Sequence, residues 1–151
     1  MLAKNLLYSI VLHENGNLSK ILYSHVQCNS SSFRYFDGVR FRNENYGAIP
    51  ENVLTHVDTQ TGLIKSQWGA NLFYMPHGLT IDHQGNFWLT DIAMHQVFMF
   101  KSDDLTRPAL TVGQKFQSGA GHNQFCRPAD VAVMKNGDFF VADGYVFSTE
   151  S

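Results

Sequence analysis

An internal repeat constrains the fold of this chain more than any other feature of its sequence. The stretch PHGLTIDHQGNFWLTD, residues 76–91, aligns without a gap with PADVAVMKNGDFFVAD, residues 128–143, 52 positions later. Both copies begin with proline, carry glycine at the same place and end with aspartate, and their apolar residues alternate in step. A weaker third copy near the N-terminus places Ile10, Leu12 and Gly16 in the same relation. Such repetition indicates a small structural unit that is stacked several times.

Each copy has the pattern of a β-hairpin. In residues 76–91, Leu79 and Ile81 alternate with polar residues, the segment DHQGN supplies a glycine-containing turn, and FWLTD forms the second strand. Two further short strands are predicted at residues 96–100 and 109–113, with a polar turn between them. No segment keeps an apolar stripe of helical period over three turns. The sequence therefore predicts an all-β fold built from four-stranded units.

Four short strands in a unit of about 40–50 residues are typical of a β-propeller blade. Units of that size fit about three times into 151 residues, whereas propellers close with about four to eight blades. The last copy is followed by VFSTES, which does not continue the pattern. We therefore expect residues 1–151 to form an open arc of about three blades, truncated after residue 145. Residues 28–50 are polar and are predicted to form a loop, with a strand within YFDGVRF at 35–41.

Composition excludes several classes of function. Charged residues make up 16% of the chain and the formal net charge is -2, so no basic surface for nucleic acid is predicted. No apolar run reaches the roughly 18 residues of a transmembrane helix. The segment LLYSIVL is not followed by a small-residue cleavage site, and we expect a strand there and no signal peptide. Cys28 and Cys126 do not make a disulfide framework, and they indicate no compartment.

Two residues at the ends of predicted inner strands are candidates for chemistry. His77 stands at the start of such a strand, where several blades can each direct one imidazole at a zinc ion in the central channel. The alternative is a histidine that caps a strand and hydrogen-bonds to a neighbouring loop. Tyr145 follows the Asp-Gly pair that ends the last copy, and it can act as a base where a cation lowers its pKa from about 10. The alternative for Tyr145 is a side chain of the channel wall.

The remaining polar residues of the repeats are assigned to architecture. Asp91 and Asp143 occupy equivalent positions, where an aspartate after a strand closes a turn through hydrogen bonds to the backbone. His83 is expected in a solvated turn, His95 in the packing between blades and His122 in a glycine-rich loop. The sequence contains no HExxH, GxSxG, phosphate-binding loop or paired CxxC motif.

Four motifs between residues 47 and 145 carry a family resemblance. PHGL, DIAMHQVF, FCRPADVAV and VADGY occur in this order and resemble peptidyl-α-hydroxyglycine α-amidating lyase, the lyase half of the enzyme that amidates peptide C-termini. The resemblance implies the N-terminal portion of a six-bladed propeller of NHL-type repeats, which cleaves peptidyl-α-hydroxyglycine to a peptide amide and glyoxylate. It also implies zinc held by three histidines, a nearby calcium ion, a monooxygenase domain that acts before the lyase, and a place in the secretory pathway or outside the cell.

The resemblance assigns roles to four residues. His77, in the PHGL motif, is implied as a zinc ligand, and Leu79 as the donor of a backbone carbonyl to calcium. Ile10 supplies a second calcium-binding carbonyl if the weak N-terminal alignment holds. Tyr145, in the DGY motif, is implied as the base that deprotonates the substrate hydroxyl, whose pKa zinc lowers.

The chain also departs from the family's pattern. The other two zinc histidines and the aspartate of the calcium site belong to later blades of the family. Leu22 or Tyr23 stands where the family has a catalytic arginine, and Val146 replaces a cysteine, so that Cys126 lacks its expected disulfide partner. We therefore expect the 151-residue chain to retain no stoichiometric zinc and to release no glyoxylate.

Two other functions remain open at this point. The chain is alternatively a non-catalytic NHL-repeat module that binds a protein partner, or a structural fragment with no activity. An open propeller leaves an unpaired flank and a bare apolar face, both of which favour aggregation. The combination of PHGL with DGY favours the lyase over the binding module, because a binding module does not require it.

Overall fold

The computed structural model describes residues 10–12, 19–23, 36–37, 40–42, 44–58 and 60–144. Within these ranges the chain contains β-strands, turns and one 3-10 turn, η2 (Glu44–Tyr46), and no α-helix. The strands are β1 (Ile10–Leu12), β2 (Ser19–Tyr23), β3 (Phe36–Asp37), β4 (Arg40–Phe41), β5 (Leu54–Asp58), β6 (Ile64–Trp68), β7 (Pro76–Ile81), β8 (Phe87–Asp91), β9 (Gln96–Phe100), β10 (Leu110–Val112), β11 (Pro128–Val133) and β12 (Phe139–Asp143). The predicted all-β class is confirmed.

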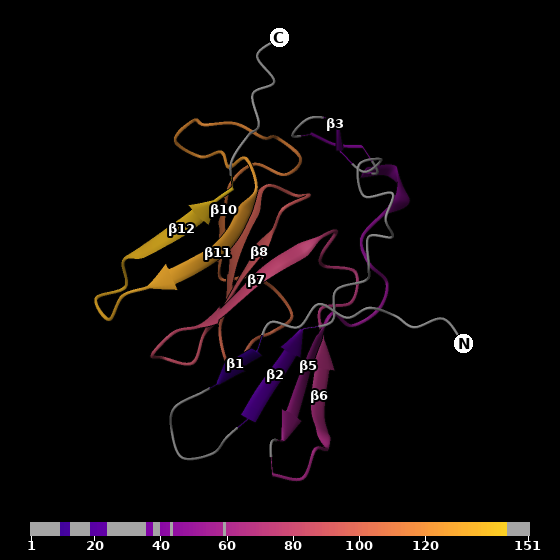
Figure 1. Ribbon diagram of the computed structural model, residues 1–151, viewed down its shortest axis with the longest axis vertical. Coiled ribbons are helices and arrows are strands. Elements are labelled where there is room, and N and C mark those ends of the chain that lie inside the picture. The colour runs from indigo at the N-terminus through magenta and orange to yellow at the C-terminus, as the bar shows by residue number, and fades with distance from the viewer. Residues whose placement is uncertain are drawn as a thin grey trace.

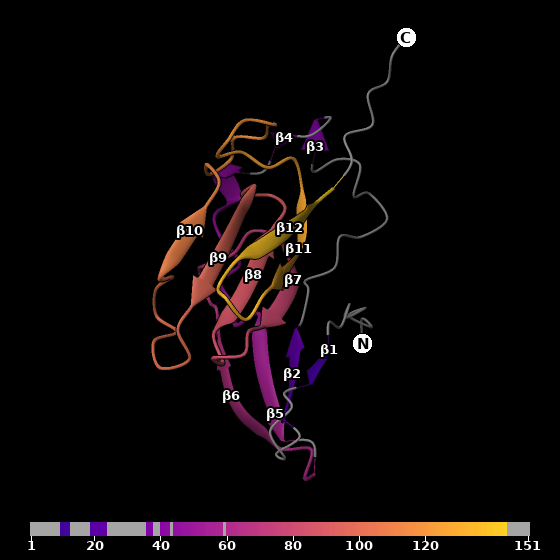
Figure 2. The same ribbon diagram turned by 90° about the vertical axis from the view of Figure 1, so that its left-hand side faces the viewer.

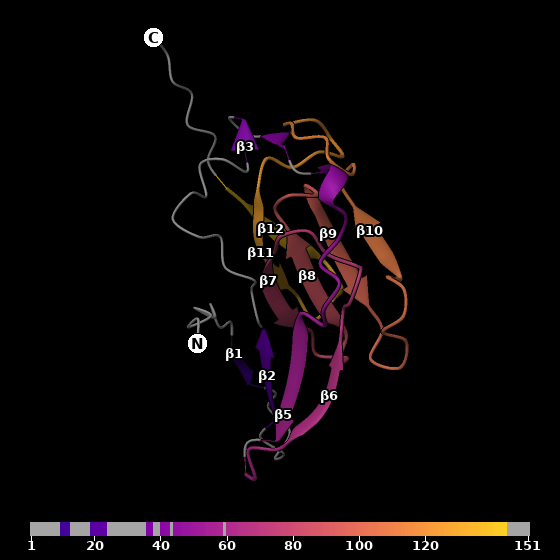
Figure 3. The same cartoon turned by 90° about the vertical axis from the view of Figure 1, so that its right-hand side faces the viewer.

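The strands form successive blades of a propeller. The first four-stranded antiparallel sheet has the order β1-β2-β5-β6, and the second has the order β10-β9-β8-β7. The hairpin β11–β12 follows as the inner half of a third blade, and β7 contacts β1 on one side and β11 on the other (Figure 1). Figures 2 and 3 show β10 at the outer margin of the second sheet, with β7 beside β11. The innermost strands β1, β7 and β11 therefore begin each blade.

The two strong copies of the repeat are structurally equivalent, as predicted. Pro76 pairs with Asp91 and Pro128 pairs with Asp143, and the register shifts directly after the proline in both hairpins. The glycine in each hairpin turn has a positive φ, 84° in the first copy and 95° in the second, which suits glycine. The alternation of apolar and polar residues determines which side chains face the core, and the turn determines how the two strands of each hairpin are aligned.

Other parts of the first blade differ from the expectation. The weak third copy implied the same hairpin length, but Leu79 pairs with Leu89, ten residues on, whereas Ile10 pairs with Leu22, twelve residues on. Gly16 lies outside the described residues. The segment YFDGVRF contains two short paired strands, β3 and β4, where one strand was expected. No strand was predicted at β5 or β6, although the turn between them carries a glycine.

Aromatic side chains fill both junctions between blades. Between the first two sheets, Trp68 meets Phe87 and Phe100 edge-on, with ring centroids 5.7 Å and 5.1 Å apart. Between the second sheet and the hairpin, Trp88 packs on Phe139 at 4.7 Å. Such pairs contribute about 0.5–1.5 kcal/mol beyond the burial of their area. The residues buried at the first junction are Val53, Leu54, Phe73, Leu79, Leu89, Met94, Phe98 and Phe100.

A buried carboxylate organises the turn between β7 and β8. Asp82 accepts hydrogen bonds from the backbone N–H groups of Gln84 and Asn86, both at 2.9 Å. Its second oxygen accepts from Asn86 Nδ2 at 2.9 Å and from Trp88 Nε1 at 3.0 Å. Burial raises the pKa of Asp82, but the hydrogen bonds from Trp88, Asn86 and Gln84 outweigh it and lower the pKa. The ionised form therefore stabilises the fold.

We predict that Asp82→Asn destabilises the chain and weakens its acid sensitivity. Hydrogen bonds to a charged group contribute about 1.5–3 kcal/mol, and an amide NH₂ cannot accept from Trp88. Because the folded pKa is depressed, this stabilisation is present above the unfolded pKa of about 4 and is lost as the pH falls below it. Urea unfolding between pH 3 and pH 7 measures both effects, with exposed Asp103→Asn as the control. Equal acid sensitivity in Asp82→Asn and in the unmodified chain would contradict the assignment.

Candidate metal and catalytic site

His77 is exposed at the start of β7, and its ring is held in one orientation. Its Nδ1 lies 2.8 Å from the carbonyl oxygen of Ala129 in β11. A carbonyl only accepts, so Nδ1 carries the proton and donates it. The neutral ring then presents the lone pair of Nε2, which is the arrangement of metal-binding histidines whose other nitrogen donates to a backbone carbonyl. This geometry fits His77 as one metal ligand.

The glycine after His77 allows the two inner strands to meet. A Cβ atom on Gly78 would lie 2.4 Å from the oxygen of Ala129 and 2.8 Å from Cα of Asp130. Both distances are steric clashes, so any larger residue at position 78 would push the two strands apart. The N–H of Gly78 donates to Thr90 Oγ1 at 2.8 Å, which ties it to β8. The Pro-His-Gly sequence therefore places the histidine where β7 approaches β11 most closely.

The other residues assigned by the resemblance are placed only in part. Leu79 lies on β7 with its side chain 4% exposed in the core, and Ile10 begins β1, an inner strand that contacts β7. Tyr145 and Cys28 lie outside the described residues, and so does the replaced cysteine position, Val146. Within the described ranges no group of three or more His, Cys, Asp or Glu side chains is arranged to hold a metal ion. Any further ligands for a metal at His77 therefore come from elsewhere.

Asp91 confirms its architectural assignment and also fixes the segment that leads to His77. Its Oδ2 accepts from the backbone N–H groups of Tyr74 at 2.7 Å and Met75 at 2.9 Å. Its Oδ1 accepts from Ala93 at 3.0 Å and Met94 at 2.9 Å. Burial raises the pKa of the Asp91 carboxyl, while these four N–H donors favour its ionised form. The residue joins the segment before β7 to the turn after β8 through one fully buried group.

Asp143 repeats the same clamp one blade later. Its Oδ2 accepts from the N–H of Cys126 at 2.8 Å and its Oδ1 from the N–H of Arg127 at 2.7 Å. The N–H of Gly144 donates to the carbonyl of Arg127 at 2.8 Å. These bonds hold Asp143 and Gly144, the two residues before Tyr145, against Cys126 and Arg127. The segment that follows Arg127 contains Ala129, whose carbonyl accepts from His77. The clamp therefore connects the chain just before Tyr145 to the hydrogen-bond partner of His77.

His95 packs between blades, as expected, and does so with an unusual backbone conformation. Its side chain is 0% exposed and its φ is 57°, a left-handed value that is uncommon outside glycine. Nδ1 lies 2.6 Å from the carbonyl oxygen of Cys126, and Nε2 has no hydrogen-bond partner. Burial lowers the pKa of His95 below its usual value, against the bond to Cys126. The ring is therefore neutral and ties the second sheet to the segment before β11.

His83, His122 and Cys126 have surface or structural positions. His83 and His122 are exposed, in a hairpin turn and a loop respectively, as predicted. Cys126 is a free, half-buried thiol, and burial raises its pKa, so it is not activated as a nucleophile.

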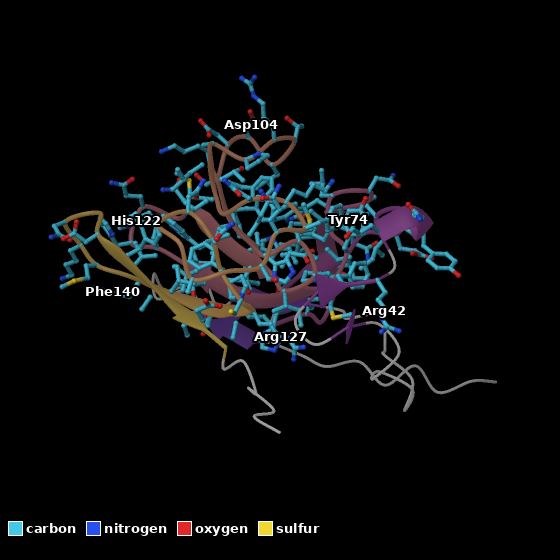
Figure 4. All side chains as sticks on the ribbon, turned by 90° about the horizontal axis from the view of Figure 1, so that it is seen from above. Arg42, Tyr74, Asp104, His122, Arg127 and Phe140 are labelled. Atoms are coloured by element: carbon cyan, nitrogen blue, oxygen red, sulfur yellow. The ribbon has the colours of Figure 1, made fainter. Side chains whose placement is uncertain are left out.

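An aromatic cluster of three rings was not predicted from the sequence. Phe41, Tyr74 and Phe116 come from three separate segments, and the Tyr74 and Phe116 rings meet edge-on at 4.9 Å. Lys115 Nζ lies 4.9 Å from the centroid of Tyr74, within the range of a cation–π contact. Figure 4 shows Tyr74 on the same side of the view as Arg42 and on the opposite side from His122. No sequence spacing signals this cluster, because the three rings are far apart along the chain.

The chain is similar in sequence to several known proteins. A sequence model of the NHL repeat matches residues 125–148. The chain is 49% identical over 118 residues to peptidyl-α-hydroxyglycine α-amidating lyase 2 of Drosophila melanogaster, covering 74% of this chain and 29% of the fly protein. It is 52% identical over 113 residues to lyase 1 of the same fly, covering 73% and 20% of the two chains. It is 46% identical over 106 residues to peptidyl-glycine α-amidating monooxygenase B of Xenopus laevis, covering 70% and 12%.

Sheets of antiparallel strands in consecutive blades, together with the matched repeat, define an NHL-repeat protein of the β-propeller class. The chain spans less than a third of the length of the curated relatives that it matches. Over the matched residues the chain is homologous to the peptidyl-α-hydroxyglycine α-amidating lyases, as its four motifs predicted. No helix long and apolar enough to cross a membrane occurs in the described part of the chain.

We predict that Asp91→Ala destabilises the chain much more than Asp143→Ala. Removing Asp91 leaves four backbone N–H groups without their partner in a buried site, and each such group costs about 1–3 kcal/mol. The expected loss is therefore at least about 3 kcal/mol. Asp143 is exposed and accepts from two backbone N–H groups, so Asp143→Ala should lower the free energy of unfolding by less. Denaturant unfolding of the two matched variants measures the difference, and equal losses would refute the role of burial.

We predict that His95→Asn reduces the loss of stability between pH 6.5 and pH 5. The lowered pKa of His95 means that its stabilising contribution is present above the unfolded value of about 6.5 and is lost as the pH falls. Arg127 adds to the lowering, whereas Asp143 and Glu44 oppose it. Asparagine tolerates the left-handed conformation, so the backbone is retained. Thermal unfolding across this pH range tests the claim, with exposed His122→Asn as the control; an unchanged pH profile for His95→Asn would rule it out.

Proposed function

We propose that this chain provides part of the active site of a zinc-dependent lyase that cleaves peptidyl-α-hydroxyglycine to a peptide amide and glyoxylate. The observation that supports the proposal most is His77, whose Nδ1 donates to Ala129 and whose Nε2 is thereby available to a metal. The names of the curated fly relatives give the substrate class. The chemistry follows from that substrate, which carries a hydroxyl and an amide nitrogen on the same carbon.

His77 is the residue that would hold zinc through Nε2, together with donors from outside the described residues. Zinc, when bound, lowers the pKa of an oxygen that it contacts and so assists proton removal at neutral pH. Calcium would take backbone carbonyls of Leu79 and Ile10, since oxygen ligands suit this ion. Both residues lie on innermost strands that contact each other, and this supports a shared site.

Tyr145 is proposed as the general base. Its phenolate oxygen takes the proton of the substrate hydroxyl, the hydroxyl oxygen forms the carbonyl of glyoxylate, and the carbon–nitrogen bond breaks. The departing amide nitrogen keeps the electron pair of that bond and receives a proton, which gives the peptide amide. Asp143 and Gly144 restrain the chain just before Tyr145 through their bonds to residues 126 and 127. This restraint would limit the motion of the phenol relative to His77.

The relatives also suggest a place in a reaction sequence. The frog relative is named a peptidyl-glycine α-amidating monooxygenase. We propose that an oxygenase of that kind hydroxylates the terminal glycine and supplies the substrate, and that both steps occur in the secretory pathway or outside the cell. A non-catalytic role in binding a protein partner is the alternative, and an assay of catalysis separates the two.

The sharpest test places residues 47–145 in the corresponding part of the full-length fly lyase that is 49% identical to the chain. We predict that this chimera releases glyoxylate from a peptidyl-α-hydroxyglycine. His77→Ala and Tyr145→Phe should each lower kcat/KM at least about 100-fold, the scale at which general bases act. Only His77→Ala should also lower the zinc content, measured by elemental analysis after dialysis.

Two controls complete the design. His83→Ala removes an exposed turn histidine and should leave both turnover and zinc content unchanged. The 151-residue chain by itself should retain no stoichiometric zinc and release no glyoxylate, since one imidazole does not hold zinc tightly. A folded chimera without turnover would refute the lyase proposal. Turnover by the isolated chain that His77→Ala abolishes would show that fewer ligands suffice.

A further inference from the structure

His95 combines several features that raise the free energy of the folded state. It is a non-glycine residue with φ of 57°, its side chain is 0% exposed, and its Nε2 is a buried atom without a hydrogen-bond partner among the described residues. A left-handed backbone and an unpaired buried polar atom each cost free energy. Such features cluster at functional sites, where the surrounding structure enforces them. The contacts of the other ring nitrogen, Nδ1, indicate what this residue does.

His95 and its neighbour Gln96 hold the segment that connects β10 to β11. At the start of this segment, Gln96 Nε2 donates to the carbonyl of Gly113 at 3.1 Å. Gly113 lies so close that a Cβ atom on it would overlap the carbonyl oxygen of His95. At the end of the segment, His95 Nδ1 lies 2.6 Å from the carbonyl oxygen of Cys126, and because a carbonyl only accepts, Nδ1 is the donor. Both ends of the connection between β10 and β11 are therefore bonded to the same two residues.

Cys126 is held between His95 and Asp143. Its carbonyl accepts from His95 Nδ1, and its N–H donates to Asp143 Oδ2 at 2.8 Å. Asp143 and Gly144 directly precede Tyr145 in the sequence. The N–H of Gly144 donates at 2.8 Å to the carbonyl of the residue that follows Cys126. A displacement of Cys126 would therefore also displace the chain just before Tyr145.

The same segment continues to the hydrogen-bond partner of His77. Ala129 follows Cys126 by three positions, and its carbonyl accepts from His77 Nδ1 at 2.8 Å. The bond at Cys126 therefore influences the placement of both His77 and Tyr145.

We propose that His95 is a positioning residue of the candidate active site, which holds residues 126–129 in place through the bond from Nδ1 to the carbonyl of Cys126. This inference rests on the proposed lyase function, because it concerns the placement of His77 and Tyr145 relative to each other. An apolar side chain of similar volume would avoid the unpaired Nε2, so packing by itself does not require a histidine here. The donor on Nδ1 is what such a side chain would lack.

Three variants of the full-length chimera separate the donor from the other properties of the ring. His95→Leu keeps most of the volume and His95→Gly suits the left-handed backbone, but neither side chain donates to Cys126. His95→Asn suits the same backbone and keeps an NH₂ donor near the place of Nδ1. The leucine and glycine variants should each lower kcat at least about tenfold with little change in KM, since a misplacement of roughly 1 Å can cost about 100-fold in rate. The asparagine variant should retain most of kcat.

Amide hydrogen exchange on the 151-residue chain tests the positioning itself without an assay of catalysis. The amides of Cys126, Arg127 and Gly144 form the bonds that join this segment to the end of β12. They should exchange faster in His95→Leu and His95→Gly than in His95→Asn, because local opening of the segment exposes them to water.

Two controls separate positioning from a general loss of stability. The amides of Gln84 and Asn86 donate to Asp82 in the turn after β7, and their exchange should be unchanged in all three variants. His122→Leu replaces an exposed histidine of the loop between β10 and β11, and it should alter neither kcat nor exchange.

Equal kcat values in the unmodified chimera, His95→Leu and His95→Gly overturn the proposal, and so does an equal loss of kcat in His95→Asn. Faster exchange at the turn of Asp82 as well as at Cys126 would show that His95 only stabilises the fold, and it overturns the proposal too. An unmodified chimera without turnover refutes the lyase function and with it the catalytic part of this inference. The exchange rates then still decide whether His95 holds Cys126 in place.

Discussion

The close approach of β7 and β11 is the constraint on which the rest of the described structure depends. It requires Gly78, because the backbone of Ala129 and Asp130 occupies the space of a side chain. That approach allows the carbonyl of Ala129 to accept a hydrogen bond from His77 Nδ1, and the carbonyl of Val131 to accept one from Thr80 Oγ1. It also brings Phe139 onto Trp88, so the same contact closes the apolar junction and orients the candidate metal ligand. Packing and chemistry therefore share one interface between blades.

A carboxylate clamp occurs at equivalent positions in the second sheet and in the β11–β12 hairpin. Asp91 and Asp143 end equivalent strands, and each accepts from the two backbone N–H groups that directly precede the inner strand of the same hairpin. The donors supplied by the backbone offset the cost of removing a carboxylate from water. The clamps define the chain direction just before Pro76 and Pro128. The histidine at the start of β7 and its carbonyl partner in β11 are thus positioned by the same device.

Local sequence patterns made two hairpins predictable. Where such patterns are weak, at β3–β4 and in the N-terminal copy, the predictions were wrong. Alternating apolar residues around a turn glycine identified β7, β8, β11 and β12, and the run QVFMF coincides with β9. In YFDGVRF no such alternation separates the two strands of β3–β4, so a single strand was expected. The weak N-terminal copy lacked the closing aspartate, and its hairpin is two residues longer than the alignment implied. Register is well specified only where both the pattern and the turn agree.

The sequence by itself determined the repeat, the class of fold, the family motifs and the position of His77 at the start of an inner strand. These properties depend on residues that are close in the chain or on copies of one pattern. Only the tertiary structure decided which nitrogen of His77 carries the proton, because its partner Ala129 lies 52 residues away. It likewise decided that His95 is buried against Cys126 and that three distant rings meet around Tyr74. Such contacts arise when blades pack, and the packing of one blade on the next is not encoded in the local pattern of either.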